Sequence, residues 1–142
     1  MDPLYINILL GVNSIIFLSL SLLHVYWASG GQWAGGQVLP QMETRGDKVF
    51  IPGKGMTLSV AAGLLSFSIL NAVNLYNQRS QPLFRYGLLA LGLIFIVRVL
   101  GDFKYVGIAK CVRNTEFAQN DDRIFIPLCA YLALSSVVAY FF

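Results

Sequence analysis

The first part of the sequence, from Pro3 to Met42, contains no Asp, Glu, Lys or Arg. Over the whole chain 56% of the residues are hydrophobic and 12% are charged, whereas about 25% are charged in an ordinary soluble domain. A soluble domain must keep its surface wetted, and this chain has too few charged groups to do so. These features predict an integral membrane protein that forms a single domain over residues 1–142.

Four apolar segments are long enough to cross a bilayer. A spanning helix needs roughly 20 mostly apolar residues, because each adds about 1.5 Å across a hydrocarbon core of about 30 Å. The first segment lacks the basic start and short apolar run of a cleavable signal peptide. We therefore expect an all-α, multi-pass protein of the cell membrane, surrounded by lipids. Its bundle of four transmembrane helices should cover about residues 4–28, 56–76, 83–101 and 125–142.

The connections between these segments differ in length. The turn at about 77–82 is short, whereas the connections at about 29–55 and 102–124 are long. Four crossings place both long loops on one side of the membrane and both chain ends on the other. Lys and Arg favour the cytoplasmic side, and they are concentrated on the long-loop side, which predicts cytoplasmic long loops. The residues on that side are Arg45, Lys48, Lys54, Lys104, Lys110, Arg113 and Arg123, against Arg79 and Arg85 on the other.

The same tripeptide occurs before the second and the fourth apolar segment, as Phe50-Ile51-Pro52 and Phe125-Ile126-Pro127. Two explanations stay open. The tripeptides belong to two helical hairpins related as a parallel repeat, or they recur by chance, because proline is common at helix starts.

Arg98 lies inside the third apolar segment, where a charge costs about 2.5–3.5 kcal/mol at mid-bilayer. Such a charge needs a partner or a function. Asp102 is four residues further on and would share a face of a continuous helix, so we expect an Arg98–Asp102 pair. In a purely structural alternative Arg98 extends to the interface. In the functional one, which we favour, its planar group of donors binds an anionic group.

Aromatic and titratable residues gather near the same end of the bundle. His24 is the only histidine; it either makes one interfacial hydrogen bond or handles a proton near neutral pH. No spacing of His, Cys, Asp or Glu indicates a metal site, and Cys111 and Cys129 read as free thiols. The net charge of +3 is scattered, which argues against a nucleic-acid partner.

Two strings resemble the signatures of a bacterial family known as domain of unknown function 3995. They are His24-Val-Tyr-Trp-Ala-Ser-Gly-Gly31 and Arg98-Val-Leu-Gly-Asp-Phe-Lys-Tyr-Val-Gly107. The stretch 110–127 is similar to that family as well, including Thr115-Glu-Phe-Ala and Asp122. The resemblance covers nearly the whole chain and implies a small protein with four membrane spans. It implies no activity.

Three functions compete on these observations. The favoured one is a site for an anionic amphiphile, such as a lipid headgroup or a quinone-like molecule, on the long-loop face. A small intramembrane enzyme acting on a lipid-soluble substrate is the second, although no nucleophile or phosphate-binding motif supports it. The third is a transporter or channel subunit, which would need a homo-oligomer. The sequence names no cofactor. The predicted ligand-binding residues are His24, Tyr26, Trp27, Arg98, Asp102, Lys104 and Tyr105.

Overall fold

The computed structural model describes residues 2–34, 38–40, 51–77 and 81–142. Over these residues the chain is helical and contains no strand. Four helices are long and apolar enough to cross a membrane, so the expected four-span bundle is confirmed. The elements are α1 (Pro3–Ala28), α2 (Lys54–Tyr76), α3 (Pro82–Leu100), α4 (Glu116–Asn120), the π-helical segment η1 (Asp121–Phe125) and α5 (Ile126–Phe141).

Local sequence signals set where the helices begin and end. Asp2 caps α1 by accepting a hydrogen bond from the Leu4 backbone N–H at 2.9 Å, which satisfies one of the free donors of the first turn. Prolines occupy the first position of α1 and of α3, where their missing N–H is not needed. Gly101 ends α3 with a φ of +87°, a conformation that favours glycine.

The fourth crossing differs from the sequence expectation. A loop was expected up to residue 124, but α4, η1 and α5 follow one another as one helix over Glu116–Phe141. Pro127 therefore lies inside a continuous helix, whereas Pro52 lies before the start of α2. The two tripeptides thus occupy different local structures, and Phe50 lies outside the described residues. This difference weakens the parallel-repeat explanation.

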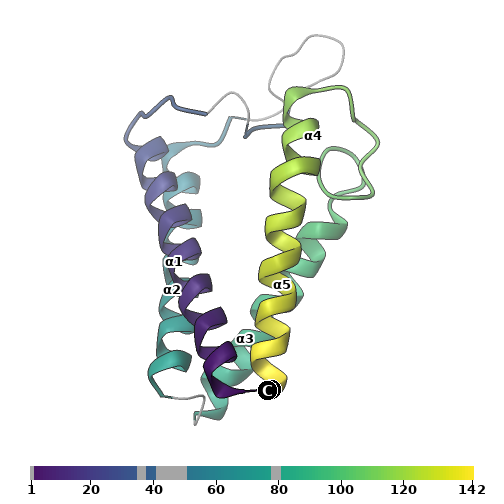
Figure 1. Cartoon of the computed structure of the whole chain (residues 1–142). Coiled ribbons are helices and arrows are strands. Elements are labelled where there is room, and N and C mark those ends of the chain that lie inside the picture. Colours follow the sequence, from purple (N-terminus) through teal and green to yellow (C-terminus); the bar gives the residue numbers. More distant parts are fainter. Residues whose placement is uncertain (1, 35–37, 41–50, 78–80) are drawn as a thin grey trace.

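The helices associate as two pairs. Helix α1 packs mainly along α2, and α3 packs mainly along α5, with smaller contacts between α1 and α5 and between α2 and α3. Figure 1 shows the two pairs close together at the end that holds the chain ends and further apart at the loop end. The cavity that forms the candidate site lies between the pairs at the loop end.

Two apolar clusters fill the interior between the pairs. The first, which we call the terminal-end cluster, consists of Ile6, Leu10, Leu88 and Ala139. The second, the middle cluster, consists of Phe17, Leu91 and Leu132. All members of both clusters are at most 1% exposed.

A few polar contacts join helices inside the bundle. Asn13 of α1 donates to Ser135 Oγ of α5 at 2.9 Å. Asn74 of α2 donates to the Phe84 carbonyl of α3 at 3.0 Å. Within a bilayer such bonds contribute on average about 0.6 kcal/mol each, so they fix the relative placement of the helices more than they stabilise the bundle.

Candidate functional site

A cavity of about 1180 Å³ lies at the loop end, between the α1/α2 pair and the α3/α5 pair. It is larger than the roughly 300–1,000 Å³ of most small-molecule sites. Its wall is formed by the helices α1, α2 and α3, by the continuous α4–η1–α5 helix, and by the segment after α1. Among the described residues that line it, Arg98 is the only one with a permanent charge. The lining residues include His24, Trp27, Trp33, Arg98, Phe117 and Phe125.

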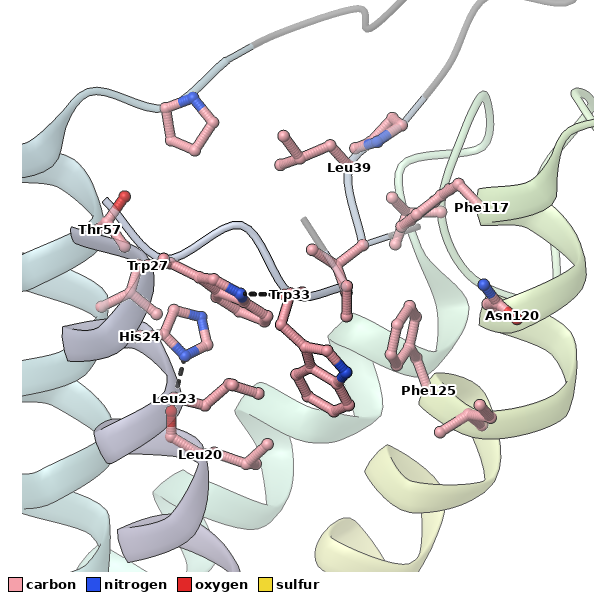
Figure 2. A pocket seen from close by; sticks show the side chains of 18 of the residues that line it. Leu20, Leu23, His24, Trp27, Trp33, Leu39, Thr57, Phe117, Asn120 and Phe125 are labelled. Carbon is pink, nitrogen blue, oxygen red and sulfur yellow. Dashed lines mark hydrogen bonds between the residues drawn. The ribbon is translucent and has the colours of Figure 1, made fainter. Parts of the chain in front are cut away.

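Both tryptophans of the protein line this cavity. The indole N–H of Trp27 donates to the backbone carbonyl of Trp33 at 2.8 Å, which ties the segment after α1 to the end of that helix. Figure 2 shows the Trp33 side chain projecting into the space between the helix pairs, at the level of Phe125. One wall of the cavity is therefore aromatic and contributed by α1 and the segment after it.

His24 lies in the same wall, edge-on to Trp27 with ring centroids 5.0 Å apart. Its Nδ1 is 2.7 Å from the Leu20 carbonyl oxygen, as drawn in Figure 2. A carbonyl oxygen only accepts hydrogen bonds, so Nδ1 carries the proton. In the neutral imidazole Nε2 is then a hydrogen-bond acceptor, and it has no partner among the described residues.

Arg98 pairs with Asp121 and not with Asp102, so the expected Arg98–Asp102 pair is wrong. The Nη2–H of Arg98 donates to Asp121 Oδ1 at 2.9 Å. The rule for residues four apart holds only within a continuous helix, and α3 ends at Leu100. At Gly101, which has a φ of +87°, the chain changes direction, so Asp102 does not lie on the face of α3 that carries Arg98.

Asp121 is fully buried and lies at the centre of an ionic cluster with Arg98, Lys110 and Asp122. Its Oδ2 accepts from the Gly107 backbone N–H at 2.8 Å and from Lys110 Nζ at 3.2 Å. The buried ammonium of Lys110 also contacts the half-exposed carboxylate of Asp122. Two cations and two anions therefore meet here, and the formal charge of this ionic cluster is zero.

The cluster leaves one buried donor atom of its described residues without an acceptor. Arg98 Nη1 is buried and has no hydrogen-bond partner in the described part of the chain. A guanidinium donor that is removed from water and left unpaired is costly. Unpaired groups of this kind are rare, and they call for an explanation such as a bound ligand or water.

Asp102 has a local role instead. Its Oδ1 accepts from the backbone N–H groups of Lys104, Tyr105 and Val106 at 3.0, 2.7 and 2.9 Å. Partial burial by itself would raise the pKa of Asp102, but these backbone hydrogen bonds outweigh it and hold the pKa below its ordinary value. Asp102 thus stabilises the turn that follows α3, and it does not line the cavity.

The seven predicted site residues separate into two groups. His24, Trp27 and Arg98 line the cavity together. The other four do not: the Tyr26 ring packs against the backbone of Gly31, and the Lys104 ammonium lies over the Tyr105 ring, 5.1 Å from its centroid. Whether any of the seven binds a ligand stays a prediction.

Sequence reasoning missed Asp121 and Lys110. A loop was expected at both positions, and charged loop residues are normally solvated. One signal was available, because a charge inside a membrane segment requires a partner. Few acidic residues in the connection after α3 can serve as one. They are Asp102, Glu116, Asp121 and Asp122.

Residues 17–136 match the model of a family described as "Protein of unknown function (DUF3995)". No curated protein and no solved structure matches the chain. Within the described residues, no group of three or more His, Cys, Asp or Glu side chains is placed to hold a metal ion.

Proposed function

Because the chain belongs to the DUF3995 family, whose description assigns no activity, we propose a function from the cavity: the protein binds an amphiphile in the cell membrane. The polar group of the amphiphile lies against Arg98, and its hydrocarbon part lies among the aromatic and aliphatic walls. The observation that carries this proposal is the cavity itself, which places one cation in a mainly apolar and aromatic wall. Sites for amphiphiles combine these two features.

The depth of the cavity suits an amphiphile. Arg98 is in the last turn of α3, close to the membrane–water boundary, where lipid polar groups lie. The aliphatic residues Leu20 and Leu23 line the side that continues toward the bilayer interior. A molecule with a polar end and an apolar body would match both parts of the wall.

The geometry favours binding over transport by a single chain. The described cavity wall belongs to the loop end, and the middle and terminal-end clusters fill the interior between the helix pairs elsewhere. A transport path would have to pass through these clusters, which are closely packed. For catalysis, the described lining residues include no nucleophile with an adjacent base in hydrogen-bond contact.

Mass spectrometry of the protein purified in a mild detergent tests the proposal. We expect an amphiphile to be retained in stoichiometric amount by the wild type and to be depleted in Arg98→Lys, because lysine lacks the planar group of donors. Arg85→Lys is the matched control. Arg85 is the other arginine in α3, it donates to the Tyr140 carbonyl at 2.8 Å, and it does not line the cavity. Retention of no amphiphile by the wild type, or equal depletion in both variants, would contradict the proposal.

A further inference from the structure

The charges around the cavity constrain the ligand further. Resting on the proposed function, we infer that the bound amphiphile has an uncharged head group of the quinone or quinol type, that is, a ring with carbonyl or hydroxyl oxygens. This inference revises the sequence expectation of an anionic ligand. Three observations carry it: the zero charge of the ionic cluster, the donor and acceptor on opposite walls, and the aromatic lining.

The ionic cluster is already neutral without a ligand. The charge of Arg98 is compensated by Asp121 at 2.9 Å, and the buried Lys110 is compensated by Asp121 and Asp122. An anionic head group against Arg98 would give the cluster a net negative charge next to the fully buried carboxylate of Asp121, and repulsion between the two like charges disfavours this. The remaining described cations of this end, such as Arg113 and Arg123, are exposed and do not line the cavity. An uncharged ligand leaves the formal charge of the ionic cluster at zero.

Each of two facing walls of the cavity nevertheless has a polar group that can form a further hydrogen bond. On the α3 side, Arg98 lines the cavity with a side chain that is 31% exposed, and its hydrogen bond to Asp121 uses one of the five N–H donors of the guanidinium. On the α1 side, the neutral form of the His24 ring offers Nε2 as an acceptor, because Nδ1 donates to the Leu20 carbonyl. The oxygen of a ring carbonyl or a ring hydroxyl accepts from Arg98, and a ring hydroxyl donates to His24. A quinol can therefore form hydrogen bonds with both Arg98 and His24. A quinone, which has no hydroxyl group, can form one only with Arg98.

The aromatic residues favour a flat ring over other neutral head groups. Trp27, Trp33, Phe117 and Phe125 come from the two facing sides of the cavity, as Figure 2 shows. Aromatic side chains attract planar rings by offset stacking or edge-to-face contact, each contributing beyond simple area burial. An acylglycerol offers hydroxyl and carbonyl oxygens but no ring for these walls.

Intrinsic fluorescence provides the test, since both tryptophans of the chain line the cavity. The protein is placed in phosphatidylcholine nanodiscs and titrated with a benzoquinone carrying a decyl chain, with empty nanodiscs as the partitioning control. We expect saturable quenching. The matching quinol should displace this probe, whereas decyl phosphate and monodecanoylglycerol should need concentrations higher by about tenfold or more.

Three variants assign the contacts. Arg98→Lys should weaken both the quinone and the quinol by about tenfold, and Arg85→Lys should leave both unchanged. His24→Phe keeps an aromatic ring but lacks the acceptor, so it should weaken the quinol more than the quinone. Equal weakening of the quinol and the quinone by His24→Phe would overturn the assigned hydroxyl contact.

The outcomes separate this inference from the proposed function. Displacement by decyl phosphate at concentrations equal to or below those of the quinol would overturn the uncharged head group and leave amphiphile binding intact. Equally effective displacement by monodecanoylglycerol would overturn the ring. A tryptophan response to none of the four compounds, together with no retained amphiphile on purification, would overturn both proposals.

Discussion

Replacing the buried carboxylate of Asp121 by an amide should destabilise the protein strongly. Asp121 is 0% exposed and accepts hydrogen bonds from Arg98, Lys110 and the backbone of Gly107. In Asp121→Asn only one side-chain oxygen can accept, and the new NH₂ group faces donors. At least one of these three donors then loses its acceptor, and two cations lose the shared negative charge.

The expected loss in the free energy of unfolding depends on how deeply each of the two cations is buried. Removing one partner of a fully buried ion pair costs about 3–5 kcal/mol, because an uncompensated charge is left behind. Here Lys110 keeps Asp122 as a partner, and the Arg98 side chain is 31% exposed. We therefore expect the lower end of the range, about 3 kcal/mol in the free energy of unfolding.

Asp122→Asn is the matched control, because it makes the same chemical change one residue away. The Asp122 side chain is 46% exposed, and pairs that reach water contribute at most about 1 kcal/mol. Unfolding of the purified variants by increasing the fraction of sodium dodecyl sulfate in mixed micelles, followed by circular dichroism, gives both free energies. If Asp121→Asn destabilises no more than Asp122→Asn, the central role of Asp121 in the ionic cluster is refuted.

Three further predictions concern other parts of the fold. Four spans place both chain ends on one side of the membrane, and tags found on opposite sides in accessibility assays would contradict this. Gly101→Ala should cost more than about 1 kcal/mol in the same unfolding assay, because a Cβ at its φ of +87° would overlap the Val106 carbonyl; Gly63→Ala, in open space within α2, should be neutral or stabilising. The lowered pKa of Asp102 means that its stabilising contribution is present above its ordinary pKa and is lost as the pH falls through the lower folded value. Stability should therefore decrease below about pH 4, and this component should disappear in Asp102→Asn.

The sequence by itself determined the membrane architecture. Inside a bilayer every backbone N–H and C=O must be bonded within the chain, so an apolar segment of sufficient length has to become a helix. Length and hydropathy are properties of single segments, which is why the expected ranges agree with α1, α2 and α3 to within two residues. Of the residues that line the cavity, His24, Trp27 and Arg98 could be singled out from the sequence, because polar and amphipathic residues at a membrane boundary are conspicuous against an apolar background.

Only the tertiary structure decided which groups meet. Asp102 was inferred as the partner of Arg98 because residues four apart share a face of a helix. Since Gly101 ends α3, this spacing does not apply to Asp102. Asp121 is 23 positions from Arg98 and reaches it because η1 continues the fourth crossing helix beyond the expected boundary. The cavity likewise exists because α1 pairs mainly with α2, and α3 with α5, leaving space between the pairs at the loop end. Such contacts depend on side-chain packing between segments distant in the chain, which the periodicity of one segment does not encode.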